Sequence, residues 1–228
     1  MAKEIKKENT EAVADAVSKT ELFFTENMKL LLTVLAVILV AGAGFFCWHK
    51  FINQPKIEEA QGQMALAEAN FRNAADSTGY ALALYGDGNV LGFEQIIDEY
   101  GSKAGKSVYF YAGICEYNLK NYESAIRHFK AYKGKDEILA ARAIACIGDC
   151  QADLGDLQGA ISSYEKAAAK ADNAFAADYL LKAGIAAEAA GDKAKALAFY
   201  KKIKDSYPMA ELPSAREIDK YISRIEAE

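Results

Sequence analysis

The side chains that could ligate a metal or act as nucleophiles are few in this chain. It contains four cysteines and two histidines; Cys47 lies within an apolar run near the start, and His49 stands at the edge of that run. Cys146 and Cys150 are one helical turn apart, so their thiols share a face but are not placed to form a disulfide. A zinc site would need further ligands, and His128 is expected on a solvated surface. We therefore predict small, buried, apolar thiols, with a redox or metal role as the alternative.

A glycine-rich segment, Gly86-Asp87-Gly88-Asn89, has the composition of some phosphate and calcium loops. It lacks the lysine and the serine or threonine of a phosphate loop, and no glutamate follows in the register of a calcium loop. A turn explains these residues better. No serine or cysteine nucleophile accompanies His128 in a recognisable motif. The sequence therefore predicts no catalytic residue, no cofactor and no metal, and hence a protein that is not an enzyme.

A glycine, an alanine and an aromatic residue recur at fixed spacing in three stretches of the chain. The alanine follows the glycine by twelve residues, and the ring follows the alanine by four. The three sets are Gly113, Ala125 and Phe129; Gly148, Ala160 and Tyr164; and Gly184, Ala196 and Tyr200. The copies are 35 and then 36 residues apart, a period typical of stacked helical hairpins. The two small residues would let paired helices approach closely, and the ring would fill the seam beside that contact.

These residues resemble the tetratricopeptide repeat, whose two helices carry facing small residues, an aromatic residue one turn later and often a terminal proline. The third copy has that proline at Pro208, whereas no copy has the tryptophan often found near the repeat start. Matching turns stand at Lys120-Asn121-Tyr122, Gly155-Asp156-Leu157 and Gly191-Asp192-Lys193. The resemblance covers about residues 106–208 and implies an all-α solenoid. A non-repeating, alanine-rich helical bundle is the alternative.

A degenerate fourth copy is predicted upstream, over residues 57–105. Residues 93–101 align with residues 200–208, so the second half of a repeat can be recognised there. Its first helix is expected over residues 57–75, followed by a loop over residues 76–90. Atypical repeats at the ends of a stack close its apolar faces.

The downstream end is predicted to be a capping helix over residues 214–227. Ser214 and Glu217 form a capping-box signature, and an apolar stripe follows at helical spacing. The whole repeat domain is then expected over residues 57–228, with full repeats starting at about residues 106, 141 and 177.

Residues 30–48 contain no charged side chain and are almost wholly apolar. This length can cross a hydrocarbon core as a helix, and Lys29 and Trp48-His49-Lys50 suit the two interfaces. We predict a transmembrane helix here rather than a cleaved signal, a lipoprotein signal or a buried core helix. Residues 1–29 are then a cytoplasmic tail, either an amphipathic helix or a frayed terminus, and the repeat domain is exported.

The tetratricopeptide resemblance implies a concave groove lined by the first helix of each repeat. The candidate groove residues are apolar or acidic, with one arginine: Phe110, Ile114, Tyr117, Arg142, Asp149, Asp153, Asp178, Leu181 and Ile185. The lysine and asparagine clamp that some family members use for a C-terminal carboxylate is absent from these positions. A hydrophobic or basic segment of another protein fits this groove. With a net charge of −5 and no basic stripe, the chain is not expected to bind nucleic acid, and no small-molecule substrate is expected.

The short tail, single span and exported repeats together resemble the YfgM family of bacterial inner-membrane proteins, as does the stretch from Leu84 to Gly101. Members of that family are ancillary subunits of the SecYEG translocon and associate with the periplasmic chaperone PpiD. The resemblance implies a membrane scaffold that links export to such a chaperone. A scaffold for cell-wall or outer-membrane assembly is the alternative, and a hydrolase or metalloprotein is a third hypothesis of a different class.

Overall fold

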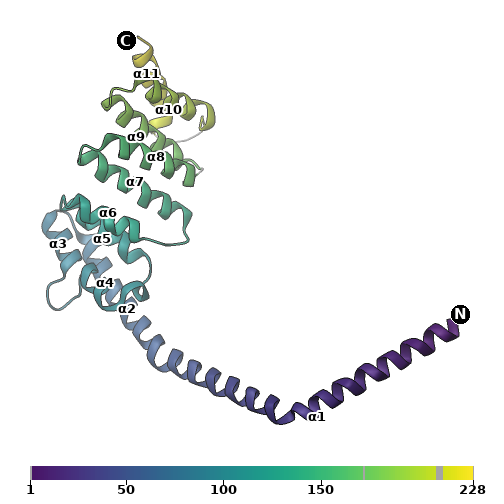
Figure 1. Ribbon diagram of the computed structural model, residues 1–228. Coiled ribbons are helices and arrows are strands. Elements are labelled where there is room, and N and C mark those ends of the chain that lie inside the picture. Colours follow the sequence, from purple (N-terminus) through teal and green to yellow (C-terminus); the bar gives the residue numbers. More distant parts are fainter. Residues whose placement is uncertain (1, 172, 209–212, 228) are drawn as a thin grey trace. The chain divides into compact units, whose positions relative to one another are not determined.

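The computed structural model describes the backbone of residues 2–171, 173–208 and 213–227, and side chains from Glu21 onward except those of 172, 209–216 and 228. Every regular element in these residues is helical (Figure 1). The chain divides into two compact units, Met1–Pro55 and Lys56–Glu228. This architecture confirms the predicted all-α fold class.

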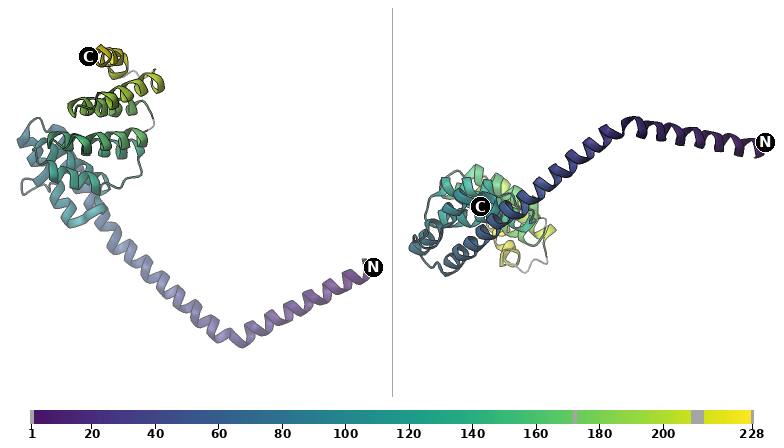
Figure 2. Two further views of the ribbon diagram at one scale, coloured as in Figure 1. Left: turned by 45° about the horizontal axis from the view of Figure 1, so that its top comes forward. Right: turned by 90° about the horizontal axis from the view of Figure 1, so that it is seen from below.

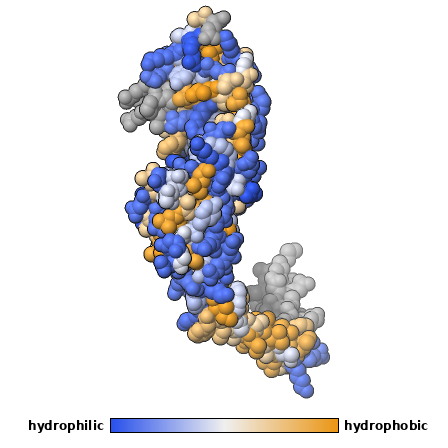
Figure 3. All heavy atoms as spheres, turned by 90° about the vertical axis from the view of Figure 1, so that its left-hand side faces the viewer, coloured by the Kyte–Doolittle hydropathy of each residue, from blue (hydrophilic) through white to orange (hydrophobic). Residues whose placement is uncertain are grey.

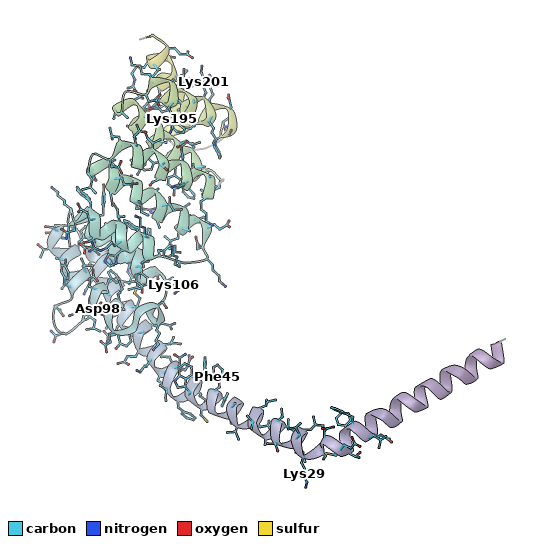
Figure 4. The ribbon with its side chains drawn as sticks, viewed as in Figure 1. Lys29, Phe45, Asp98, Lys106, Lys195 and Lys201 are labelled. Carbon is cyan, nitrogen blue, oxygen red and sulfur yellow. The ribbon has the colours of Figure 1, made fainter. Side chains whose placement is uncertain are left out.

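The first unit is built on α1 (Ala2–Trp48), followed by a short π-helix over His49–Asn53. Lys29 and Phe45 lie on α1 (Figure 4). Large apolar side chains from Leu22 to Trp48 are exposed, and Val40 keeps 74% of its surface accessible. The described helix from Glu21 onward is long and apolar enough to cross a membrane. Any amphipathic face on the tail before Glu21 lies outside the described side chains.

The apolar surface of α1 is unfavourable in contact with water. Leaving a large apolar side chain in water costs about 1.5–3 kcal/mol relative to burial, and many such residues follow one another here. Figure 3 shows apolar residues dominating the lower segment, whereas hydrophilic and apolar residues mix over the repeat unit. A hydrocarbon core would cover this helix on all sides, so α1 is compatible with single-pass anchoring.

The second unit begins within α2 (Gln54–Asn73), which is followed by α3 (Ser77–Tyr85) and α4 (Phe93–Tyr100). The predicted loop over residues 76–90 is therefore wrong in its first half, because α3 occupies it. The Asp76 carboxylate accepts a hydrogen bond from the backbone N–H of Gly79 at 2.9 Å and so caps the helix start. Gly86, at a φ of 76°, ends it.

The remaining α-helices form three successive antiparallel pairs, followed by a single last helix. They are α5 (Ser107–Asn118), α6 (Tyr122–Ala131), α7 (Glu137–Asp153), α8 (Leu157–Ala171), α9 (Phe175–Ala189), α10 (Lys193–Ser206) and α11 (Pro213–Ala227). Each helix packs on the next along the chain, and α11 also reaches α9 (Figures 1 and 2).

One contact is repeated in all three full copies. The aromatic ring of the second helix lies directly over the glycine of the first, in the pairs Gly113 with Phe129, Gly148 with Tyr164 and Gly184 with Tyr200. A Cβ atom added to the glycine would stand only 2.7, 2.7 and 2.3 Å from the nearest ring carbon in these pairs. The ring therefore packs directly on the glycine. From the sequence we expected it to lie beside the contact between the two small residues.

The turns inside the three copies also share one backbone conformation. Lys120, Gly155 and Gly191 occupy the same place after the first helix, with φ angles of 64°, 81° and 82°. This left-handed conformation is strained for residues other than glycine, and Lys120 is the only such case in the described part of the chain. The predicted alignment of the turns is therefore seen in the backbone.

Buried side chains form a succession of clusters along the stack rather than one central core. Residues of α2–α5 make the first cluster, those of α5–α7 the second and those of α7–α11 the third. Ile218 and Ile222 of α11 join the third cluster beside Tyr200. In the predicted capping box, Glu217 pairs with Lys220 at 2.8 Å, and the Ser214 side chain lies outside the described ones.

Candidate protein-binding groove

Two pockets open on the α7–α9 side of the second and third repeats. The walls of the larger, of about 350 Å³, include Arg142, Asp149, Asp178 and Leu181. The walls of the smaller, of about 290 Å³, include Asp149 again together with Ile185. Five of the predicted groove residues therefore gather around one hollow region.

Asp149 is the polar centre of this region. Its Oδ1 atom accepts a hydrogen bond from the Tyr164 hydroxyl at 2.7 Å and another from the Lys182 ammonium at 2.7 Å. Lys182 also lies over the Tyr164 ring, 5.8 Å from its centroid. These three residues join α7, α8 and α9, so the carboxylate is held in one position on the pocket wall. Burial raises the pKa of the Tyr164 phenol, and the neighbouring Asp149 carboxylate raises it further.

Lys182 is a wall residue of both pockets that the sequence did not single out. It occupies the same repeat position as Cys146, 36 residues earlier, so the alignment of the copies alone could have placed it on this face. Because the Lys182 side chain is 46% exposed, its ion pair with Asp149 contributes little to the stability of the fold. Its main effect is to hold the Asp149 carboxylate in one orientation.

The remaining predicted groove residues lie nearer the first repeat. Burial raises the pKa of the Tyr117 phenol, and the neighbouring Asp153 carboxylate raises it further. Ile114 is half-buried against the second cluster. Phe110 is 7% exposed and packs against the rings of Phe129 and Tyr132, with centroids 5.7 and 6.1 Å away. Phe110 is therefore a core residue and offers little surface to a ligand.

The expectation of a solvated His128 is wrong. Its side chain is 13% exposed, and its Nε2 atom lies 2.8 Å from Glu94 Oε1. This hydrogen bond lowers the pKa of the Glu94 carboxyl. Because Glu94 belongs to the degenerate copy and is 34 residues away, sequence spacing offered no signal for the pair.

The three thiols of the repeat unit are free and shielded from solvent to different degrees. Cys115 and Cys150 are fully buried, and Cys146 is half-buried. Burial raises the pKa of Cys115 and of Cys150 to about 12, and that of Cys146 to about 11. Such thiols stay protonated near neutral pH, which makes them poor nucleophiles.

The Gly86-to-Asn89 segment forms a turn closed by an aspartate. The Asp87 carboxylate accepts hydrogen bonds from the backbone N–H groups of Asn89 and Val90, at 2.9 and 2.8 Å. These bonds lower the pKa of the Asp87 carboxyl. Asp87 thus has the local structural role expected of an aspartate in a turn.

Comparison with known families agrees with this geometry. Residues 147–211 match the family model described as a tetratricopeptide repeat, and no curated protein matches the chain. The match begins within α7 of the second copy and includes the third copy, so it covers most of the residues that line the two pockets. The helical architecture and this match together fit a tetratricopeptide-repeat protein with one helix able to span a membrane. Repeats of this class are typically non-catalytic surfaces that bind other proteins.

Proposed function

We propose that the chain is a non-enzymatic, membrane-anchored adaptor whose repeat groove binds a segment of another protein. The observation that carries this proposal is the pair of pockets between α7 and α9. There the exposed side chain of Ile185 lies near the oriented carboxylate of Asp149. An apolar anchor next to a fixed polar group is the arrangement that gives a peptide site both affinity and register.

The chemistry of the groove favours a segment with apolar side chains and at least one basic residue. Leu181 and Ile185 offer apolar contact, and Asp149 and Asp178 offer carboxylates on the same walls. A lysine or arginine of the partner would find charge-assisted acceptors there.

The finer proposal is that this adaptor works at the bacterial Sec translocon. The N-terminal tail would be cytoplasmic, α1 would lie in the inner membrane, and the repeats would face the periplasm. The partners would be SecYEG and a PpiD-like periplasmic chaperone, so the adaptor would link export to chaperoning. The resemblance of the tail, span and repeat array to the YfgM family supports this placement.

Photocrosslinking in intact bacterial membranes tests the groove and its partners together. A photoreactive residue at Ile185 of the full chain should trap channel subunits or a periplasmic chaperone. The matched control carries the same residue at Lys166, an exposed position of α8 that lines neither pocket. Identical products from the two positions would contradict the groove. Products restricted to cell-wall or outer-membrane machinery would favour the alternative scaffold.

A further inference from the structure

Three metal-ligating side chains from three helices converge away from the groove. They are Glu94 of α4, Glu116 of α5 and His128 of α6, whose donor atoms all lie within 4.8 Å of one another. Glu116 is 5% exposed, and its Oε2 atom accepts a hydrogen bond from the Asn121 side chain at 2.7 Å. The side chains of His128 and Glu94 are 13% and 30% exposed, so the cluster stays open to solvent on one side.

The second repeat provides an internal comparison for this cluster. Gln151 and Ser163 stand 35 residues after Glu116 and His128, at the same repeat positions. The Ser163 hydroxyl donates to Gln151 Oε1 at 2.5 Å, and the Gln151 amide donates to Asp156 Oδ2 at 3.3 Å, so both positions hold neutral side chains there. The third repeat has Ala187 and Phe199 at these positions, both buried. The fold therefore requires no ionisable group at either position.

Two carboxylates in a partly buried site need a positive charge beside them, which either a protonated His128 or a bound metal ion can supply. Burying a carboxylate is costly unless it is paired, and two carboxylates held close together repel each other. The first repeat thus keeps an electrostatic cost that the other copies avoid.

We propose that Glu94, Glu116 and His128 bind a divalent transition-metal ion of the zinc type. Imidazole nitrogen and carboxylate oxygen are ordinary zinc ligands, and three protein ligands at about 2.0–2.2 Å leave a fourth position for water. Ligand atoms around such an ion lie roughly 3.3–3.6 Å apart. His128 Nε2 and Glu94 Oε1, now 2.8 Å apart, would separate slightly, and the donor atoms that lie farther apart, within 4.8 Å, would approach by about 1 Å. Because α4 belongs to the degenerate copy and α5 and α6 belong to the first full copy, the ion would link these two copies and stabilise their packing.

Zinc titration of the metal-free, full-length protein in detergent tests the site by calorimetry. We expect one Zn²⁺ per chain, and zinc should raise the thermal unfolding midpoint. The double variant Glu116→Gln with His128→Ser copies the polar pair of the second repeat, so its helical fold should survive. It should bind Zn²⁺ at least about a hundredfold more weakly and show no thermal shift.

Two further variants separate this site from other sources of zinc binding. His49→Ala removes the other histidine of the chain and should bind as the wild type does. Glu94→Gln changes a partly exposed ligand, so it should fold and lose affinity even if the double variant does not fold. Unchanged binding in Glu94→Gln or in the folded double variant, or no binding by the wild type, would overturn the proposal. Because the groove lies on other residues, either result leaves the adaptor proposal standing.

Discussion

The first and second full repeats share one framework and differ in the chemistry built on it. Both place an aromatic ring over a glycine and turn through a left-handed residue at the same position. In the second repeat the ring is Tyr164, whose hydroxyl reaches Asp149. In the first repeat the corresponding residues are Phe129 and Ile114, which are both apolar. The framework therefore fixes where side chains stand, and leaves their polarity free to vary between copies.

This difference divides the repeat unit into regions of unequal character. The part of the groove around Asp149 is polar and oriented by bonds among three helices. The first repeat is apolar at the matching place. It carries instead Glu116 and His128, which form a cluster with Glu94 of the degenerate copy. One backbone pattern thus supports two distinct candidate sites.

The largest expected effect comes from removing the shared ring in either copy. Phe129→Ala and Tyr164→Ala should each lower the free energy of unfolding by about 3–5 kcal/mol, because each leaves a cavity over its glycine. Urea unfolding of the full chain, followed by circular dichroism, measures both. Phe175→Ala, at a side chain that is 45% exposed, should lower stability by no more than about 1.5 kcal/mol, well below the loss at either buried ring. A loss confined to one copy would contradict the shared framework.

Adding a methyl group under the ring should have the next largest effect. In Gly148→Ala the new Cβ would stand 2.7 Å from the Tyr164 ring, which is buried and has little room to move. We expect a loss of about 1–3 kcal/mol despite the better helix propensity of alanine. Gly62→Ala is the control, because its Cβ would meet nothing within 4 Å. That variant should be more stable by up to about 1 kcal/mol, and equal behaviour of the two would refute close packing at Gly148.

Removing the Tyr164 hydroxyl should have a smaller effect that is specific to the second copy. Tyr164→Phe keeps the ring over Gly148 and leaves Asp149 with Lys182, so the expected loss is about 0.5–1.5 kcal/mol. The same urea titration measures it. Tyr164→Phe gives the second copy the same residue that the first copy has at this position, Phe129. A loss as large as that of Tyr164→Ala would mean that the hydroxyl, and not the ring, dominates the packing.

Lys182→Met should have the smallest effect on stability. Its ion pair with Asp149 joins a half-exposed ammonium to a carboxylate that still has a hydrogen-bond donor in Tyr164. We expect a loss below about 1 kcal/mol, which should shrink further in high salt. A loss that is large and insensitive to salt would show that Lys182 stabilises the fold as well as orienting Asp149.

The repeating part of the fold was predictable because its signals are local and recur. Gly113, Gly148 and Gly184 stand at nearly constant spacing from their rings, and each pair closes within a single hairpin. The prediction failed at α3, where residues of a degenerate copy have no second copy to confirm them. The Asp76 carboxylate that caps α3 at Gly79 was not recognised as a helix start, and the whole of residues 76–90 was predicted as a loop.

The candidate sites were less predictable because they join residues of different repeats. The alignment of copies placed Arg142, Asp149 and Ile185 on one face, and the pockets lie there. It also placed Phe110 on that face, although neighbouring rings bury it. The same alignment gave no indication that His128 meets Glu94.

The sequence by itself determined the helical hairpins, their number of residues per copy and the apolar helix near the start. These depend on periodicity, small residues and turn conformations, which act over one or two helices. Only the tertiary structure decided which repeats share contacts, such as His128 of the first full copy with Glu94 of the degenerate copy, and Lys182 of the third copy with Asp149 of the second. Such contacts depend on how far each hairpin is rotated against the next. That rotation results from the packing of many side chains at once and is not encoded in any single spacing.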